Sequence, residues 1–310
     1  MREHIQSYVY TYICHEDERP LCELELRRLF GKAPSASFVE SSKAIEPSRS
    51  PFIKMRLAVM VEGGNRRDIA EWVKQLNLEG NTFKIVFVEC DSSVDYSEQR
   101  AIEREIGLHI RGRAEMRTPQ RQFGIAKLGS RWVFGALTKS EAIWLHHNEK
   151  PQHYSTALST RVARAVANIA VPDPQGIQAI DPCCGIGTVL IEALSMDMDI
   201  VGYDLNPLAV RGARVNLAHF GLPNVVNLGD IRKIEGAYDV LILDLPYNLC
   251  SVLPSEDQLD MLIAARRLSR LAVVVSTEEI DSALELSGFM IMDRCTVKKG
   301  SFARQVCVCL

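Results

Sequence analysis

The sequence predicts an α/β protein in which a parallel sheet, covered by helices on both faces, is preceded by a smaller α+β region. Three observations lead to this prediction. The chain has 310 residues, which is long for a single core and favours two domains. From about residue 150, apolar segments alternate with helical patterns, as is typical of a parallel sheet buried on both faces. The first 145 residues lack this alternation and mix strands with helices.

The N-terminal half is expected to form strands and helices in an irregular order. Alternation of β-branched and aromatic residues predicts strands over 7–14, 52–64, 82–90 and two pieces of 122–137. Helical patterns cover 20–31, 67–76 and 97–110. Pro20 favours the start of the first helix and Gly31 favours its end. We divide this half into an N-terminal region over 1–60 and a second domain over 61–145.

The C-terminal half alternates regularly and then ends in a different pattern. Predicted helices cover 156–170, 188–196, 207–221 and 256–269, and predicted strands cover 176–182, 199–204, 224–230, 238–247 and 271–277. Within 289–310, two strand-like runs flank the sequence KKGS, which predicts an antiparallel hairpin. A parallel sheet closed by such a hairpin resembles the Rossmann-like sheet of class I methyltransferases, whereas a dehydrogenase domain keeps its strands parallel. This domain is expected to cover 146–310, with a linker near 146–155.

Composition narrows the functional classes. The hydrophobic content of 47% and charged content of 24% are those of a globular protein, and the net charge of −3 gives no global signal for nucleic acid. The nine cysteines are scattered and odd in number, which favours a reducing cytoplasmic location. No paired CxxC motifs occur, so no metal site is expected. No secretory or membrane-spanning stretch is predicted.

The glycine-rich turn "DPCCGIGT" (181–188) raises a choice between two cofactors. Gly185 and Gly187 allow the backbone to approach a ligand without a Cβ in the way. A dinucleotide fingerprint needs a third glycine, and Leu190 stands at that position. S-adenosylmethionine remains as the alternative ligand. Taken alone, the turn is equally compatible with an ordinary strand-to-helix connection.

Two aspartates follow the next two predicted strands. Asp204 ends its strand 23 residues after Asp181 and can accept both hydroxyls of a ribose. Its alternative role is to cap the following helix, but Asn206 is the better cap. Asp230 is expected to face an adenine amino group, and a plain turn aspartate is the alternative.

The sequence "DLPYN" (244–248) follows the fourth apolar strand and decides between these possibilities. It resembles the D-P-P-Y motif of amino-group methyltransferases, with Leu245 in place of the usual first proline. Asp244 and the Leu245 carbonyl would hold the hydrogens of an amine, Pro246 would shape the loop, and Tyr247 would stack on an extruded base. In isolation this segment is more often a polar turn. Because all four motifs occur in order, we predict a methyltransferase that uses S-adenosyl-L-methionine.

The motifs together resemble a specific enzyme family. "DPCCGIGTVLIEAL", "YDLNPLAVRGARVNL", "GDIRKI" and "DLPYN" are similar to the blocks of THUMP-containing tRNA guanosine-N2 methyltransferases of the position-10 type. The resemblance implies a ferredoxin-like region over 1–60, a shortened THUMP-like RNA-binding domain over 61–145, and tRNA as the partner. It implies that cofactor-binding residues are Asp181, Cys183, Gly185, Gly187, Thr188, Asp204, Leu205, Asp230, Ile231 and Asp244. Asp181 would hold the methionine ammonium.

A basic segment could contact RNA phosphates. Its cations are Arg111, Arg113, Arg117, Arg121, Lys127 and Arg131, with Glu115 as the acid among them. A solvated hairpin face is an equally good explanation. The sequence carries no signal for a protein partner.

Three other functions remain open from the sequence. A DNA adenine or cytosine amino methyltransferase shares the fourth motif, although its target-recognition domain is ordinarily longer. A protein-glutamine methyltransferase is disfavoured because that family carries Asn where Asp244 stands. A non-catalytic RNA-binding protein with a degenerate pocket would be consistent with Leu245.

Overall fold

A computed structural model describes residues 7–35, 37–91, 94–154, 156–246, 255–299 and 302–310. The chain divides into two compact units. The N-terminal unit comprises Met1–Ile13 and Pro34–Glu141, and the C-terminal unit comprises Cys14–Ala33 and Ala142–Leu310. No helix in the described ranges is long and apolar enough to cross a bilayer.

The observed division differs from the predicted boundaries. Strand β3 (Ile53–Gly63) runs across residue 60, so that the predicted regions 1–60 and 61–145 share one sheet. Helix α1 (Arg19–Phe30) belongs to the C-terminal unit, although it lies early in the chain. Periodicity shows that α1 has an apolar face, but it does not show which sheet that face will cover. The boundary predicted at 145/146 lies close to the observed one at 141/142.

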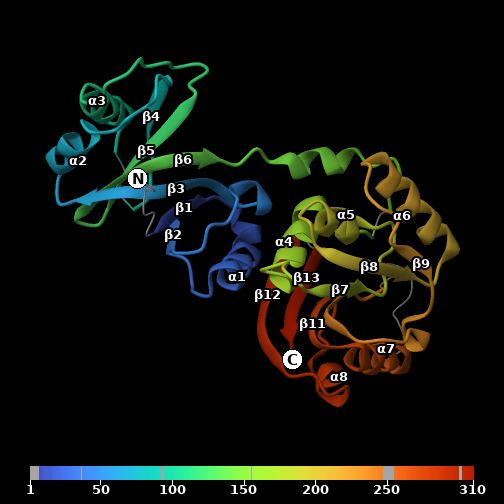
Figure 1. Cartoon of the computed structure of the whole chain (residues 1–310). Coiled ribbons are helices and arrows are strands. Elements are labelled where there is room, and N and C mark those ends of the chain that lie inside the picture. Colours follow the sequence, from blue (N-terminus) through green and yellow to red (C-terminus); the bar gives the residue numbers. More distant parts are fainter. Residues whose placement is uncertain (1–6, 36, 92–93, 155, 247–254, 300–301) are drawn as a thin grey trace. The chain divides into compact units, whose positions relative to one another are not determined.

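The N-terminal unit is a six-stranded sheet with two helices on one face. Its elements are β1 (Tyr8–Tyr12), β2 (Phe38–Ser41), β3, α2 (Arg66–Val73), β4 (Phe83–Phe87), α3 (Tyr96–Gly107), β5 (Arg121–Leu128) and β6 (Arg131–Lys139), with a 3-10 turn at Pro47–Arg49. The strand order is β2-β1-β3-β6-β5-β4, and β4 and β5 form the parallel pair. Helices α2 and α3 pack on the face that carries Phe123, Ile125 and Phe134 (Figure 1).

The C-terminal unit is built from alternating helices and strands after α1. Its helices are α4 (Thr160–Ala170), α5 (Thr188–Leu194), α6 (Pro207–His219), α7 (Ser255–Leu268) and α8 (Asp281–Leu286), with 3-10 turns at Glu16–Glu18, Ile143–Glu149 and Ile231–Lys233. Its strands are β7 (Gln178–Asp181), β8 (Asp199–Asp204), β9 (Val226–Leu228), β10 (Tyr238–Asp244), β11 (Ser269–Ser276), β12 (Ile291–Lys299) and β13 (Phe302–Cys309). The sequence patterns predicted neither β2 nor α8.

The seven strands form one sheet in the order β12-β13-β11-β10-β7-β8-β9. The strands from β11 through β9 are parallel, and β13 is antiparallel to both of its neighbours. Helices α4, α5 and α6 cover one face, and α7 and α8 cover the other (Figure 1). The predicted parallel sheet with a terminal hairpin is therefore confirmed, and it is the class I methyltransferase arrangement.

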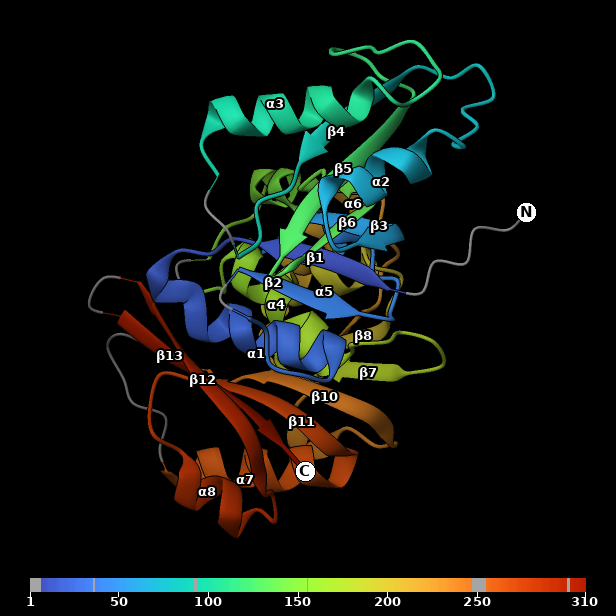
Figure 2. The same cartoon turned by 90° about the vertical axis from the view of Figure 1, so that its left-hand side faces the viewer.

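Helix α1 is tied to the same unit by buried and charged contacts. It lies beside α4 and β12 (Figure 2). Asn168 of α4 donates a hydrogen bond from Nδ2 to Glu25 Oε1 at 2.7 Å, and both side chains are fully buried. Arg27 makes a bidentate ion pair with Asp293 of β12. Because a buried polar pair must be complete to be tolerated, these contacts specify where α1 docks.

Candidate active site

A cavity of about 500 Å³ opens at the carboxyl ends of β7, β8 and β10, within the C-terminal unit. Parallel α/β sheets bind ligands at this edge, and the volume is that of a small-molecule site. The predicted site residues that line it are Asp181, Cys183, Gly185, Thr188, Asp204, Leu205, Asp230, Ile231, Asp244, Leu245 and Pro246. Gly187 is not among the lining residues, and Tyr247 lies outside the described residues. The structure thus brings residues from four separate motifs to one cavity.

The glycine turn connects β7 to α5 and is held by hydrogen bonds from its own backbone. Asp181 is 3% exposed and its Oδ1 accepts a hydrogen bond from Cys183 N at 3.2 Å. Gly187 adopts a φ of 81°, and a Cβ there would lie 3.3 Å from the Ala213 Cβ of α6. Gly187 therefore shapes the turn and its packing on α6, while Gly185 faces the cavity.

Asp204 ends β8 and links it to the glycine turn. Its Oδ2 accepts a hydrogen bond from Gly185 N, and its Oδ1 accepts one from Asn206 N, both at 2.8 Å. Asn206 caps α6 by accepting from Leu208 N, as the sequence predicted, and Pro207 begins the helix. Both carboxylate oxygens of Asp204 therefore already accept a backbone hydrogen bond. Each carboxylate oxygen retains a second lone pair that can accept a hydroxyl.

Asp230 has a partner that the sequence analysis did not assign. Arg232 donates to both carboxylate oxygens, with its Nε 2.9 Å from Oδ1 and its Nη2 2.7 Å from Oδ2. This bidentate pair lowers the pKa of Asp230. Asp230 lines the cavity, but its acceptors point to Arg232, and the buried Ile231 side chain offers the apolar surface that a purine ring needs.

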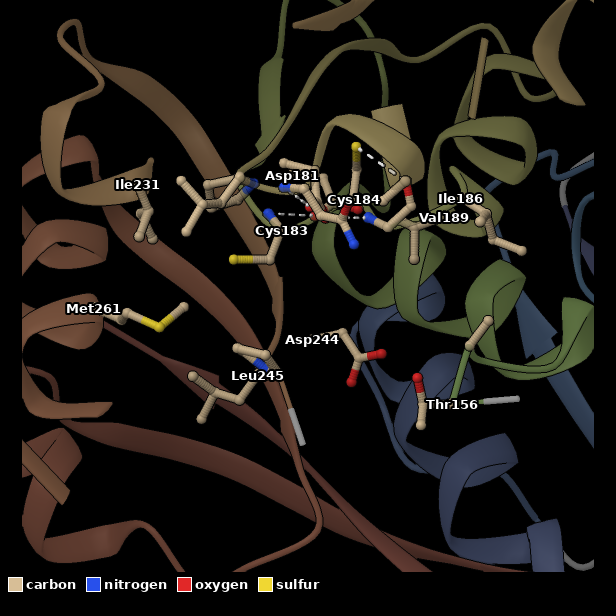
Figure 3. Close-up of a pocket in the computed structure, with 18 of the residues that line it drawn as sticks. Thr156, Asp181, Cys183, Cys184, Ile186, Val189, Ile231, Asp244, Leu245 and Met261 are labelled. Carbon is tan, nitrogen blue, oxygen red and sulfur yellow. Dashed lines mark hydrogen bonds between the residues drawn. The ribbon is translucent and has the colours of Figure 1, made fainter. Parts of the chain in front are cut away.

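Asp244 is the chemically distinctive group of the site. Its Oδ1 is buried and has no hydrogen-bond partner in the described part of the chain. Burial raises the pKa of Asp244 from 3.8 to about 7, and the charge of Arg304 opposes that rise. A buried acceptor without a partner is costly unless a ligand completes it. Figure 3 shows Asp244 below the turn that carries Asp181 and Cys183, with its carboxylate directed toward Thr156.

Leu245 takes the position of the usual first proline, and the structure gives a physical reason why it can. Its N–H donates to the Val275 carbonyl at 2.9 Å, which extends the β10–β11 ladder by one residue. Proline lacks this donor. The Leu245 side chain is 3% exposed and packs in the core beneath α7. At position 245, a hydrogen bond to the neighbouring strand therefore restrains the backbone, where a proline would restrain it through its fixed φ.

The cavity has the features that S-adenosylmethionine requires. Asp181, Asp204 and Asp244 converge on it, and burial raises the pKa of Asp181 well above its usual range. A ligand with an ammonium and a sulfonium would compensate the negative charge of these carboxylates. Thr188 Oγ1, which is buried and without a described partner, supplies a further hydroxyl. Ile231 and Met261 add apolar surface (Figure 3).

Several lining residues were not predicted from the sequence. They include Thr156, Leu158, Ile186, Val189, Arg232, Asp257 and Met261. Thr156 and Leu158 lie in the segment before α4, which the family resemblance had singled out only as a helix. The apolar residues carry no local signal, because a side chain in a pocket and one in a core look alike in sequence.

The six predicted RNA-binding cations lie in the N-terminal unit and differ in their surroundings. Arg111, Arg113 and Arg117 are exposed on the segment between α3 and β5, and none forms an ion pair with a described residue. Arg121 is ion-paired with Glu79. Arg131 pairs with Glu40 and Glu62, whereas Lys127 is half-buried on β5. Among the residues that the structure describes, no cluster of metal-ligating side chains occurs.

Comparisons with known proteins agree with this geometry. Residues 148–252 match the family described as RMKL-like, methyltransferase domain. The chain is 25% identical over 260 residues to a tRNA (guanine(10)-N2)-dimethyltransferase of Methanothermobacter thermautotrophicus, which covers 76% of each protein. It is 32% identical over 115 residues to the tRNA (guanine(10)-N2)-dimethyltransferase of Pyrococcus abyssi, which covers 35% of this chain and 34% of that protein. The predicted family resemblance is thereby confirmed.

The fold is also found among solved structures. The crystal structure of TrmN from Thermus thermophilus superposes with a TM-score of 0.51 and 17% identity, over 98% of this chain and 99% of that one. At this identity the match shows a common fold.

Proposed function

Because residues 148–252 match the RMKL-like methyltransferase domain family, we propose that the protein methylates the exocyclic N2 amine of a guanosine in tRNA, using S-adenosylmethionine. The single observation that carries this proposal is the buried Oδ1 of Asp244 at the end of β10, which has no hydrogen-bond partner among the described residues. It lies in the same cavity as the glycine turn. The names of the two archaeal relatives support the choice of amine and of RNA.

The residues of the cavity divide into a donor-binding part and an amine-binding part. When bound, S-adenosylmethionine supplies a methyl group on a positively charged sulfur that leaves as a neutral thioether. Asp181 would hold its ammonium, Asp204 its ribose hydroxyls, and Ile231 one face of its adenine. Asp244 and the Leu245 carbonyl would accept hydrogens from the amine and so direct its lone pair toward the methyl group. Asp244 then takes the proton that the nitrogen loses.

The acceptor character of Asp244 favours guanine over other amino bases. In guanine, the N2 amine stands next to N1–H, so two donors face the same direction. In adenine and cytosine, the amine stands next to a ring nitrogen that is an acceptor. A carboxylate offers two acceptor oxygens and would repel that ring nitrogen. Asp244 therefore matches the guanine edge better than the adenine or cytosine edge.

The N-terminal unit is proposed to bind the RNA. Arg111, Arg113 and Arg117 present three exposed guanidinium groups that form no ion pair with a described residue, although the charge of Glu115 interacts with that of Arg113. Such groups suit phosphate contacts. We keep the ferredoxin-like and THUMP-like assignments of this unit as proposals. We also propose a cytoplasmic location, which the free state of all eight described cysteines supports.

The first experiment identifies the product. The full chain is incubated with methyl-labelled S-adenosylmethionine and bulk tRNA or plasmid DNA, and the nucleic acid is digested to nucleosides. We expect N2-methylated guanosine from tRNA alone. Asp244→Asn should abolish methyl incorporation and retain cofactor binding, while Asp260→Asn, on the exposed face of α7, should behave as wild type. Methylated adenine or cytosine from DNA, or tRNA binding without cofactor binding, would reject the proposal.

The second experiment tests the RNA-binding surface. Arg111, Arg113 and Arg117 are changed together to Glu, and tRNA affinity is measured at several salt concentrations. We expect weaker binding and a shallower slope of log K against log salt, by about one per lost phosphate contact. Arg270→Glu, an exposed position in the C-terminal unit, is the charge-matched control. Equal slopes in the wild type, the triple variant and Arg270→Glu would exclude these three arginines as phosphate contacts.

A further inference from the structure

The terminal hairpin brings Arg304 to the reactive edge of the sheet. β11 lies beside β10 with Val275 opposite Asp244. β13 runs antiparallel to β11 and pairs Val306 with Val275. The start of β13 therefore reaches the sheet edge at which β10 ends, and Arg304 lies two residues before Val306.

Two contacts fix the Arg304 guanidinium. Its Nη2 donates to the Thr156 carbonyl at 3.0 Å, and its central carbon lies 4.7 Å from the centre of the Phe302 ring. Thr156 lines the cavity and lies across from Asp244 (Figure 3). Arg304 thus connects the hairpin to the part of the cavity wall that lies across from Asp244. A guanidinium held at two points keeps its charge in a defined place.

That charge acts on Asp244. Burial is the larger influence and raises the pKa of Asp244, while Arg304 lowers it. The other titratable groups that interact with Asp244 in the described structure are Asp181 and the Cys183 thiol, both from the turn after β7. The charge of Asp244 raises the pKa of both groups, so neither of them favours the carboxylate form of Asp244. Arg304 is therefore the group in this set that favours the carboxylate form.

We propose that Arg304 is a positioning residue for methyl transfer: it ties the terminal hairpin to the cavity wall at Thr156 and holds a positive charge at the sheet edge where Asp244 lies. This role rests on the proposed function, because it matters only if Asp244 must be a carboxylate to accept the amine hydrogens. Arg304 does not contact the reacting atoms in this assignment. It acts through Asp244 and Thr156.

The test measures the titration of Asp244 directly. Carboxyl-labelled aspartate is followed by NMR between pH 5 and 9 in the full chain without RNA or cofactor, and Asp244→Asn assigns the signal. We expect a midpoint near 7 in wild type. Arg304→Gln should raise the midpoint by about one pH unit, and Arg304→Lys should raise it less. Arg294→Gln removes an exposed cation of β12 that is paired with Asp281 of α8, and it should leave the midpoint unchanged.

Activity supplies a second readout. For Arg304→Gln, kcat/KM on tRNA should fall about tenfold below pH 7 and recover toward the wild-type value at pH 9, since one pH unit changes the ionised fraction tenfold. An unchanged NMR midpoint, or an equal loss at every pH with no rescue by Lys, would overturn the positioning role. If no nucleic acid is methylated but the midpoint still rises in Arg304→Gln, the proposed function fails while the influence of Arg304 on Asp244 stands.

Discussion

Replacement of Asp244 by Asn should stabilise the protein, by an amount that depends on pH. Burial raises the pKa of Asp244 from 3.8 to about 7. A carboxyl group whose folded-state pKa is raised contributes stability below its unfolded pKa, and this contribution is lost as pH rises through the folded pKa. Asn has nearly the same shape but does not titrate. The variant should therefore become progressively more stable than wild type as pH rises from about 4 to about 7.

The magnitude follows from the two pKa values. At pH 5 the folded carboxyl is mostly protonated, whereas at pH 8 it must be ionised inside the cavity. Each pH unit between these states is equivalent to about 1.4 kcal/mol. The free-energy difference between Asp244→Asn and wild type should therefore grow by about 3 kcal/mol from pH 5 to pH 8. It should then remain constant above pH 8.

Hydrogen exchange read by mass spectrometry is the suitable assay, because peptides from β10 and β11 report opening of the C-terminal unit separately from the other unit. Urea unfolding of the same samples gives the free energy of unfolding of the whole protein. Asp260→Asn provides the control, since this exposed carboxylate on α7 should show no such pH-dependent gain. An equal difference between variant and wild type at pH 5 and pH 8 would refute the assignment of a raised pKa to Asp244.

Three further substitutions test the packing around the site. Gly187→Ala should lower the stability by about 1–3 kcal/mol, because Gly187 has a φ of 81° that other residues rarely adopt. Thermal unfolding measures this loss, and an unchanged unfolding midpoint would contradict the prediction. Glu25→Ala should destabilise the C-terminal unit by about 1–3 kcal/mol in urea, because it removes the acceptor of the buried Asn168 amide. Leu245→Pro should lower the stability by about 1 kcal/mol, because it removes the N–H that donates to the Val275 carbonyl. A gain in stability would show that the fixed φ of proline matters more than this hydrogen bond.

The parts of the site that lie close in sequence were predictable, and those that depend on register were not. Asp181, Asp204 and Asp244 each end an apolar strand, and parallel strands bring their carboxyl ends to one edge. The alternation of apolar strands and helices was therefore enough to predict that these three aspartates lie close together. The hairpin was also predicted, but the pairing of Val306 with Val275 decides that Arg304 lies at the sheet edge where Asp244 ends its strand. No sequence pattern specifies that register.

Other differences arise from contacts that a local pattern does not contain. Arg232 and Asp230 are two residues apart, yet only the folded turn shows that the guanidinium occupies both carboxylate oxygens. Helix α8 has six residues, too short for a clear helical period. Helix α1 has a clear apolar face, but its place in the C-terminal unit depends on the Glu25–Asn168 hydrogen bond across 143 residues of sequence.

The burial that makes Asp244 costly to ionise also makes it suitable for its proposed role. A fully solvated aspartate would be too weak a base to take a proton from an amine near neutral pH, whereas a group with a pKa of about 7 is matched to that task. The apolar strand β10, with Leu241 and Leu243 fully buried, carries the carboxylate to the wall of the cavity, where burial raises its pKa and Arg304 limits the rise. The fold thus sets the basicity of Asp244 through two opposed influences, burial by the core and charge from the hairpin. Because β10 and β13 are separated by β11 alone, their relative placement is fixed by the hydrogen bonds of a single strand.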